Sequence, residues 1–382
     1  MGRQANVFSH DVIVIGAGII GAAIAYRLQE AGLSVGVVER EDSPATQSTA
    51  KSAAGVRVQF GAAANVLLSW ESIQEYRSEQ WLARTDYRPV GYLFLVPEEQ
   101  RAQQLASVEL QRSLGAPVEV LSPAQAQQHV AFTEDGVALA TFGPADGIID
   151  PHRTTMAYVE LARELGATFY FGHEVVALRH DGDWRISCPH ASFRAPIVVN
   201  AAGAWAGTLA LKAGFALPVE PSKRSIYTTG PVPGGHAYPL TIDVASGFYL
   251  RSEGERVIFG RSNPNEPPGF TTGVDFAWLE STLEVGLHRF PWLAEVGLDS
   301  KASWWGYYEV TPDDNPILGF MPEVPGWVNA CGFSGHGVQQ AAAVARVLTE
   351  EIRDGRASSI DIDALRLERF AGGATPSERL AI

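Results

Sequence analysis

A glycine pattern near the start of the chain constrains its fold more than any other feature. The sequence Gly-Ala-Gly-Ile-Ile-Gly at residues 16–21 directly follows Val12–Ile15, an apolar run of strand length, and opens a helical stretch over Ile20–Ala31. In such a pattern the first glycine permits a tight turn, the second lets the backbone approach a pyrophosphate, and the third allows the helix to pack closely on the strand. The helix also directs unpaired N–H groups and the positive end of its dipole at the phosphates. The pattern therefore predicts a strand–turn–helix unit that binds a dinucleotide.

Two further segments support a dinucleotide site. A second apolar strand, Val35–Glu39, ends in an acidic residue 18 positions beyond Gly21, which is where such folds bind a ribose hydroxyl. The loop at residues 48–55, Ser-Thr-Ala-Lys-Ser-Ala-Ala-Gly, follows shortly afterwards. Its hydroxyl groups can donate hydrogen bonds to a pyrophosphate, and its small residues can pack flat against a ring system. Taken alone, the same loop is equally compatible with a solvent-exposed turn.

The rest of the chain mixes helices and strands without an obvious linker between two halves. The spacing of apolar residues predicts helices over Ala62–Leu82, Glu98–Leu114, Arg153–Leu165 and Val338–Ile352, a short helix after Ala204, and strands over Val90–Val96 and Trp327–Cys331. Residues 141–249 are otherwise mostly strand-like. We therefore expect an α/β fold whose domains are interleaved along the chain.

Composition excludes several classes of protein. The 382 residues are 46% hydrophobic, which rules out disorder and fibrous repeats. A net charge of −14 argues against nucleic acid or an anionic membrane as the main partner. The apolar stretch at residues 12–25 is shorter than the about 18–20 residues of a membrane span, and no cleavable leader is recognised, so we expect a cytoplasmic protein. Two cysteines, Cys188 and Cys331, suit a reducing compartment, and the scattered histidines predict no metal site.

Three segments together resemble a known family. Residues 11–60, Val198–Trp205 and Ala330–Gln340 are similar to the D-amino-acid oxidase superfamily of FAD enzymes, in the branch of glycine oxidase, sarcosine oxidase or dehydrogenase, and the proline dehydrogenase β-subunit. The resemblance implies FAD as the dinucleotide. It also implies a Rossmann-like FAD-binding domain interleaved with an α+β substrate domain built on an antiparallel sheet. We expect the FAD-binding domain at residues 1–85, 145–215 and 305–382, and the substrate domain at 86–144 and 216–304.

The motifs and the resemblance together give a set of expected FAD-binding residues. They are Gly16, Gly18, Ile19, Ile20, Gly21, Glu39, Arg40, Ser48, Thr49, Ser52, Ala53, Val175, Ala201, Ala202, Gly203, Trp205, Gly332, Gly335, His336, Gly337, Val338 and Gln339.

The C-terminal group of this set has its own physical interpretation. The turn between a strand and a helix at Gly332–Val338 gathers N–H groups, which can stabilise the negative charge of a reduced flavin. His336 is expected to be a packed, hydrogen-bonded histidine rather than a base. The family also contains covalent flavoproteins, in which the linking histidine or cysteine stands where this chain has Ser52 or Gly306. We therefore predict that FAD is bound non-covalently.

Flavin-dependent oxidation of an amine requires a neutral amine, a C–H bond held over flavin N5, and a group that orients the substrate. A carboxylate is oriented best by a bidentate arginine. The position of Arg57 resembles that of the carboxylate-binding arginine of sarcosine oxidase; the alternative is an arginine bonded to the backbone. Tyr308 stands where glycine oxidase and D-amino-acid oxidase have a carboxylate-binding arginine, so this second orienting group is missing here, and Gln339 stands where sarcosine oxidase has a lysine.

One strand supplies two more candidates. Tyr249 is a candidate pocket wall, and Arg251 stands where sarcosine oxidase has the lysine that assists its reaction with oxygen. An exposed arginine at a strand end is the alternative for Arg251. The catalytic candidates are thus Arg57, Tyr249, Arg251 and Tyr308. Lys223 and Arg224 are interpreted as a solvated turn face.

These observations favour an FAD-dependent oxidoreductase that acts on a small amino acid or amine such as sarcosine, proline or a D-amino acid. Electrons would pass to O2 or to an electron carrier. A second hypothesis is a flavin-containing subunit or assembly factor that acts only within a hetero-complex. An NAD-dependent dehydrogenase is a third, weaker interpretation of the glycine pattern.

Overall fold

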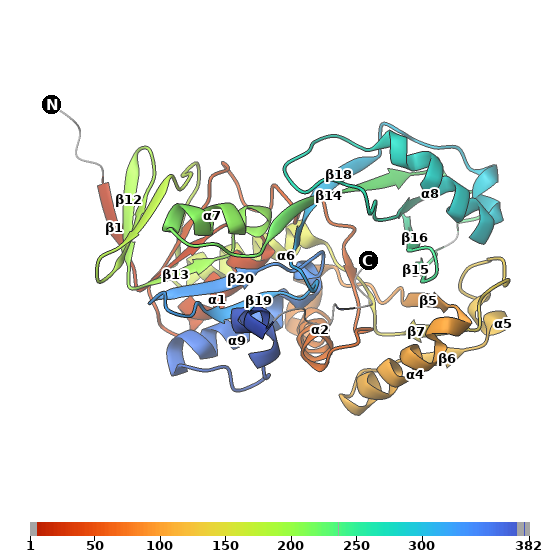
Figure 1. Cartoon of the computed structure of the whole chain (residues 1–382), viewed down its shortest axis with the longest axis horizontal. Helices are drawn as coiled ribbons and strands as arrows, with labels where there is room; N and C mark the ends of the chain where they lie inside the picture. Colours follow the sequence, from red (N-terminus) through yellow and green to blue (C-terminus); the bar gives the residue numbers. More distant parts are fainter. Residues whose placement is uncertain (1–5, 236, 373–377, 379–382) are drawn as a thin grey trace.

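The computed structural model describes residues 6–235, 237–372 and 378. Figure 1 shows two regions that lie side by side, each built on a large sheet. A six-stranded sheet and the helices α1 and α9 lie in one region, and an eight-stranded sheet with α4 and α8 lies in the other. The chain crosses between the regions several times, so neither is a continuous stretch of sequence. This interleaved α/β arrangement confirms the predicted fold class.

The six-stranded sheet is mainly parallel. Its order is β19 (Ile317–Phe320), β20 (Trp327–Cys331), β13 (Ile197–Asn200), β2 (Val12–Ile15), β3 (Val35–Val38) and β9 (Thr168–Tyr170), and only β19 runs antiparallel to its neighbour. The strands β2, β3 and β20 are buried along their whole length, as expected for parallel strands covered on both faces. The strand order reverses at β2, so the edge beyond its carboxyl end is a place where such sheets bind ligands.

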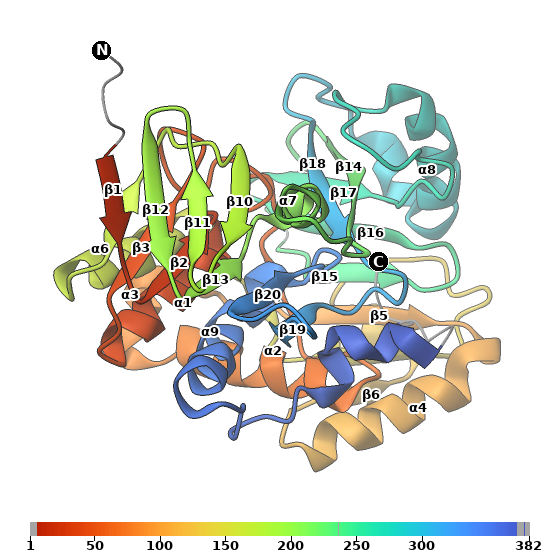
Figure 2. The same ribbon diagram turned by 60° about the vertical axis from the view of Figure 1, so that its left-hand side comes forward.

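Both faces of this sheet are covered. On one face α1 (Ile19–Glu30) packs between α6 (Pro151–Glu164) and α9 (Gly337–Asp354). On the other lies a four-stranded sheet of β1 (Asn6–Ser9), β12 (Ala191–Ala195), β11 (Trp184–Ser187) and β10 (Ala177–His180), whose strands Figure 2 shows side by side. Its inward residues Trp184, Ile186 and Phe193 pack against Ile13 and Val198 of the large sheet.

The eight-stranded sheet collects strands from three parts of the chain. Its order is β18 (Trp304–Val310), β14 (Glu220–Thr228), β17 (Arg256–Gly260), β16 (Phe248–Glu253), β15 (Leu240–Asp243), β5 (Tyr92–Val96), β7 (Leu139–Gly143) and β6 (Glu119–Leu121). All neighbours are antiparallel except β15 and β5, which are parallel. One face buries Phe248, Phe259 and Phe290 under α8 (Phe276–Arg289). The domain boundaries given above stay a prediction.

Further helices and one pair of short strands complete the fold. They are the helices α2 (Ala63–Tyr76), α3 (Glu79–Thr85), α4 (Glu98–Ser113), α5 (Pro123–Ala126) and α7 (Ala206–Ala213), and the paired strands β4 (Gly55–Val56) and β8 (Gly147–Ile148). No helix within the described residues is long and apolar enough to cross a membrane.

One predicted helix is wrong. The stretch Ala62–Leu82 forms two helices, α2 and α3, because the chain is extended at Ser78. The Ser78 hydroxyl donates a hydrogen bond to the carbonyl of Glu75, 2.7 Å away, so this side chain competes with the helical backbone pattern. The apolar spacing continues across the break, which is why the sequence alone indicated one helix.

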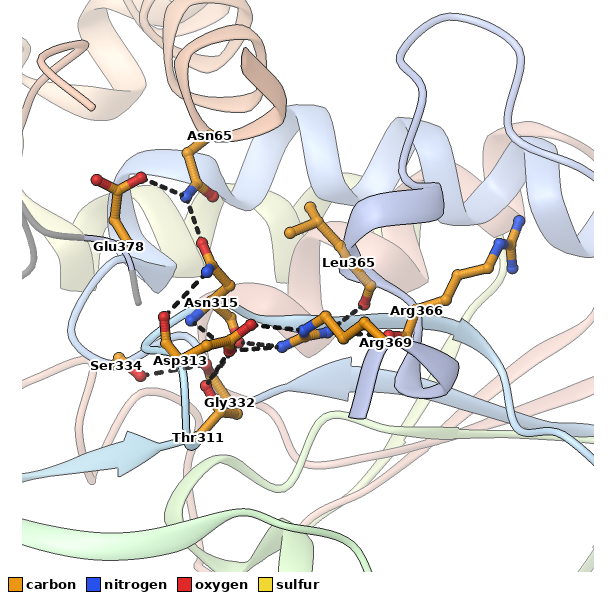
Figure 3. A network of polar contacts seen from close by, with 10 residues as sticks. All are labelled: Asn65, Thr311, Asp313, Asn315, Gly332, Ser334, Leu365, Arg366, Arg369 and Glu378. Atoms are coloured by element: carbon orange, nitrogen blue, oxygen red, sulfur yellow. Dashed lines mark hydrogen bonds and ion pairs between the residues drawn. The ribbon is translucent and has the colours of Figure 1, made fainter. Parts of the chain in front are cut away.

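A turn rich in Asp and Asn follows β18 and is tied to the C-terminal part of the chain (Figure 3). The Asp313 carboxylate accepts hydrogen bonds from Arg369 at 2.8 Å and 3.0 Å, and both side chains are buried. Burial alone would raise the pKa of Asp313, but the hydrogen bonds from Arg369 hold it below its usual value. The Asn315 side chain bridges to Asn65, which also donates to Glu378. This turn is therefore structural, and Asp313 does not line the cavity described below.

Candidate FAD site

Residues of both large sheets line a cavity of about 390 Å³. We call its two sides the dinucleotide wall and the sheet wall. The dinucleotide wall comprises residues 15–16, 18–20, 38–40, 45–49, 51–55 and 201–203. The sheet wall comprises Tyr92, Arg224, Ile226, Leu240, Ile242, Tyr249 and Tyr308. The start of α9 closes the space between them through residues 335–339.

The glycine turn forms the centre of the dinucleotide wall. Gly16 has φ +108°, and a Cβ there would lie 2.4 Å from the carbonyl oxygen of Ala201. A Cβ at Gly21 would lie 2.0 Å from the carbonyl oxygen of Gly16, so Gly21 allows the close packing that the motif predicted, although it does not itself line the cavity. Gly18, Ile19 and Ile20 do line it. The N-terminus of α1 therefore opens onto the cavity.

Glu39 and Arg40 stand at one end of the same wall. The two Glu39 carboxylate oxygens accept hydrogen bonds from the backbone N–H groups of Ala17, at 2.7 Å, and Glu41, at 2.9 Å. The carboxylate is thus fixed beside the glycine turn and lines the cavity. The Arg40 guanidinium carbon lies 3.7 Å from the ring centroid of Trp205. Val175, Ala201, Ala202, Gly203 and Trp205 line the cavity close by, as does Arg40 itself.

The loop at residues 48–55 is packed rather than free in solvent. The Thr49 hydroxyl accepts a hydrogen bond from the N–H of Ile19 at 3.1 Å, which joins this loop to the glycine turn. The Ser48 hydroxyl donates to the carbonyl of Tyr307 at 2.9 Å, which joins it to β18. The Ser52 hydroxyl accepts from the N–H of Ala54. Ser48, Thr49, Ser52 and Ala53 all line the cavity, so the solvent-turn alternative is wrong.

The C-terminal glycine segment follows the expectation only in part. Gly335, His336, Gly337, Val338 and Gln339 line the cavity, but Gly332 does not. The Gly332 N–H donates instead to the Glu309 carboxylate, 2.9 Å away. Burial raises the pKa of Glu309 to about 7, against the opposing effect of the N–H groups of Gly332 and Phe333. Glu309 lines the cavity and was missed by the sequence reasoning, because nothing local marks a strand glutamate as facing a site.

His336 is buried, with 4% of its surface exposed, and its ring packs edge-on against Phe60 at 4.9 Å. Its Nδ1 has no hydrogen-bond partner in the described part of the chain, so the expectation of a hydrogen-bonded histidine is wrong at that atom. Burial, and then the charge of Arg57, holds the pKa of His336 well below its usual value. The imidazole is therefore neutral and is not a proton reservoir near neutral pH.

Arg57 lines the cavity but is held tightly by the protein. Only 3% of the residue is exposed, and its guanidinium carbon lies 4.1 Å from the ring centroid of Phe60. One terminal nitrogen donates to the carbonyl of Gln59, and the backbone N–H donates to Gln339 Oε1 at 3.0 Å. Arg57 is therefore bonded to the backbone, which was the alternative to substrate binding, and it also lines the cavity.

Two of the three remaining catalytic candidates line the cavity, and the third lies behind it. Tyr249 and Tyr308 line the cavity, and burial raises the pKa of both phenols, so both are protonated donors. Arg251 does not line it. Its guanidinium donates to the carbonyl of Ala53 at 2.9 Å and pairs with Glu253 at 2.6 Å, so it supports the loop at residues 48–55 from behind.

The interpretation of Lys223 and Arg224 as a solvated turn face is wrong. Both are on β14 and only partly exposed. The Lys223 Nζ lies 3.6 Å from a carboxylate oxygen of Glu266, and Arg224 lines the cavity. The alternation of Arg224 and Ile226 indicates that both side chains lie on the same face of a strand. The sequence does not indicate which face of that strand meets the cavity.

The residues present fit an FAD molecule. Gly16, where the turn leaves no room for a Cβ, the first residues of α1, and His336, whose buried Nδ1 has no partner among the described residues, all line one cavity. No group of three or more His, Cys, Asp or Glu residues able to hold a metal occurs among the described residues. The fold and this cavity define a flavin-dependent oxidoreductase.

Comparison with known proteins gives the family. Residues 11–351 match the DAO family, described as FAD dependent oxidoreductase, and the chain belongs to this family. The chain is 33% identical to FAD-dependent oxidoreductase domain-containing protein 1 of Bos taurus, over 96% of this chain and 86% of that protein. It is 27% identical to mitochondrial dimethylglycine dehydrogenase of Mus musculus, over 90% of this chain but only 42% of that protein. The solved structure of L-proline dehydrogenase from P. horikoshii is 28% identical, covers 96% of this chain and 99% of its own, and superposes with a TM-score of 0.89. The resemblance and the FAD cofactor inferred from the sequence are confirmed.

Proposed function

We propose that this chain oxidises the C–N bond of a small amino acid or of an N-methyl or cyclic secondary amino acid, of the sarcosine, proline or D-amino-acid type. The carbon next to nitrogen would lose a hydride, for which N5 of bound FAD would be the acceptor, and the nitrogen lone pair would form the second C–N bond. The product is an imine, which water hydrolyses unless it is cyclic. The names of three similar proteins, L-proline dehydrogenase, dimethylglycine dehydrogenase and sarcosine dehydrogenase, support this class of substrate.

The observation that carries the proposal is the make-up of the sheet wall. Arg224 belongs to this wall, and Arg57 lines the same cavity. Burial raises the pKa of the Tyr308 phenol, and the positive charges of Arg224 and Arg57 oppose that effect. The same wall also contributes three apolar side chains, those of Ile226, Leu240 and Ile242. A small molecule with an apolar body and a carboxylate is complementary to such a wall.

The protein groups at this wall orient the substrate and exclude water rather than remove a proton. Tyr249 and Tyr308 are protonated, and His336 is neutral with a lowered pKa. The substrate amine must therefore enter in its neutral form, and the reductive rate is expected to rise with pH until the free amine predominates. Orientation and desolvation account for the remaining catalysis.

Bound FAD supplies the two-electron acceptor for this step. Residues 16–20, Glu39, the loop at residues 48–55 and the start of α9 would hold it. We propose that it is bound without a covalent link, because Ser52 and Gly306, which both line the cavity, offer no histidine or cysteine for one. The reduced enzyme would then pass electrons to O2 or to an electron carrier.

The proposal is tested by mixing the purified holoprotein anaerobically with sarcosine, L- and D-proline, pipecolate and D-alanine. Loss of the visible flavin absorbance with at least one of them is the expected result. A flavin that stays oxidised with every amino acid would refute the proposal. Reduction by the isolated chain would also count against the alternative of a subunit that works only inside a hetero-complex.

A further inference from the structure

Arg224 occupies an unusual position in the eight-stranded sheet. In the antiparallel register of β14 and β18, Arg224 is directly opposite Gly306, and Ser222 is opposite Tyr308. Alternation along β14 puts Ser222, Arg224 and Ile226 on one face, and the last two of these line the cavity. Gly306 also lines the cavity, and the space where its side chain would lie is occupied by Lys51, whose Cβ would be 3.0 Å from a Cβ at Gly306.

The Arg224 guanidinium has no anionic partner within the described residues. One terminal nitrogen donates to the Ser222 hydroxyl at 2.6 Å and to the Lys223 carbonyl at 3.1 Å. The Nε atom is buried and has no hydrogen-bond partner there. By contrast, two other buried arginines of this region are paired: Arg251 with Glu253 at 2.6 Å and Arg289 with Asp243 at 3.1 Å. A buried cationic donor that is left unpaired is costly, so a ligand anion is expected to complete it.

We propose that Arg224 binds the carboxylate of the amino-acid substrate, an inference that rests on the function proposed above. The guanidinium carbon lies 5.1 Å from the ring centroid of Tyr308, so the ring limits where the planar fork can point. The Tyr308 ring packs directly against the backbone of Gly335, where a Cβ would lie 2.4 Å from Tyr308 Cζ. This close packing holds the ring in place. A carboxylate that approaches Arg224 meets a preorganised donor.

Arg57 is the rival for this role. Its guanidinium already donates to the Gln59 carbonyl and lies over the ring of Phe60, with Tyr92 and Phe94 close by. It therefore shapes the base of the cavity and adds positive potential. Arg224 instead keeps an unused buried donor, which makes it the residue whose bonding is completed by a substrate carboxylate.

The cofactor pyrophosphate is the other possible anion. The groups expected to bind it, Gly16, Gly18 and Thr49, belong to the dinucleotide wall, whereas Arg224 stands on the sheet wall beside Tyr308. The two anions are distinguished by whether loss of Arg224 weakens FAD binding or weakens binding of a carboxylate to the FAD-loaded protein.

The test uses two ligands that cannot be oxidised. Pyrrole-2-carboxylate carries the anion, and pyrrole-2-carboxamide has the same shape without the charge. Both are titrated into the holoprotein and followed by the change in the visible flavin spectrum. We expect Arg224→Gln to weaken carboxylate binding by about tenfold to a hundredfold and carboxamide binding by less than about threefold. Arg224→Lys keeps the charge but loses the planar fork, so an intermediate loss is expected.

Two controls keep the result interpretable. Arg179 is exposed on β10 and does not line the cavity, so Arg179→Gln is expected to leave both titrations unchanged. The FAD content of each variant, measured after gel filtration, reports whether it folds and binds the cofactor. The inference is overturned if Arg224→Gln retains the preference for the carboxylate, if only Arg57→Gln abolishes it, or if Arg224→Gln and Arg224→Lys both lose FAD.

The inference and the proposed function fail separately. If no amino acid reduces the flavin while the carboxylate preference still depends on Arg224, the proposed oxidation is refuted and the carboxylate site stands. If amino acids reduce the wild-type flavin and Arg224→Gln leaves their dissociation constants unchanged, the proposed function stands and the role of Arg224 is refuted.

Discussion

The dinucleotide wall and the sheet wall of the cavity are built in different ways. The dinucleotide wall consists largely of backbone, small side chains and hydroxyl groups, and its shape depends on close approaches such as that of Gly16 to Ala201. The sheet wall consists of large side chains that come from five strands of the eight-stranded sheet, with Arg224 on β14 and Tyr249 on β16 as examples. Changes to the first wall should therefore affect folding and cofactor uptake, while changes to the second should affect the choice of substrate.

The largest expected effect concerns Gly21, where an added Cβ would meet the Gly16 carbonyl oxygen at 2.0 Å. Because that atom is backbone and not a flexible side chain, Gly21→Ala should destabilise the protein by about 3 kcal/mol or more and abolish FAD binding. Thermal unfolding and flavin content measure both effects. Gly32→Ala is the matched control, since a Cβ there meets nothing within 4 Å and only its φ of +86° opposes the change. Similar losses in the two variants would show that the turn is not specially packed.

The second prediction concerns the buried ion pair that joins the turn after β18 to the C-terminal part of the chain. Arg369→Ala leaves the Asp313 carboxylate buried without its partner and should cost about 3 kcal/mol in the free energy of unfolding. Because Arg369 holds the pKa of Asp313 below its usual value, this stabilisation is present above the unfolded-state pKa and is lost as the pH falls through the folded-state pKa.

Urea unfolding at several pH values measures this contribution. Wild type and Arg369→Ala should differ most at neutral pH and converge in acid. Asp363→Asn is the control, since Asp363 is 79% exposed and its pair with Arg366 contributes little. A neutral-pH difference below about 1 kcal/mol would contradict the prediction.

Glu309 gives a third prediction with the opposite sign. Its folded-state pKa of about 7 lies above the ordinary 4.5, so the protonated form is favoured in the folded state. Its contribution to stability is complete below pH 4.5 and is lost as the pH rises toward 7. Glu309→Gln should therefore gain about 2 kcal/mol relative to wild type between pH 5 and pH 8. Unfolding of the two proteins at these two pH values, with and without FAD, measures it; an equal pH dependence would count against a buried, titrating Glu309.

The smallest predicted effect tests the bond that joins the two walls. Ser48→Ala removes the hydrogen bond to the Tyr307 carbonyl and should weaken FAD binding about fivefold, the equivalent of about 1 kcal/mol. Fluorescence titration of the apoprotein with FAD measures the dissociation constant. Ser113→Ala on the surface of α4 is expected to leave it unchanged. No change at Ser48 would mean that the loop at residues 48–55 is held in place without β18.

The difference between the two walls also explains which site residues could be predicted from the sequence. The dinucleotide wall was predictable, because Gly16, Gly18 and Glu39 form a pattern whose spacing has one structural meaning. The sheet wall was predicted only where a family motif covered it, as at Tyr249 and Tyr308. Arg224 and Glu309 were missed, because alternation along a strand shows that two faces exist but not which of them meets a cavity assembled from distant strands.

The helices show the same limit at a smaller scale. Glu98–Ser113 and Gly337–Asp354 lie within two residues of the predicted ends, since apolar spacing determines which face of a helix is buried. The break at Ser78 could not be seen in that spacing, because one hydroxyl group decides it. Gly332 was assigned to the cofactor because its N–H was expected to be available, and only the structure shows that Glu309 accepts it.

The strand order of the six-stranded sheet has a consequence for biosynthesis. Strand β13 lies between β2 and β20 and pairs with both, so the first and the last of these strands are joined through β13. At the usual about 5–20 residues per second, a ribosome needs roughly 15–60 s to pass from the first of these strands to the last. During that interval the nascent chain exposes an apolar strand edge, a typical substrate for chaperones. Flavin can be enclosed only after translation of α9, which makes cofactor loading a late event in maturation.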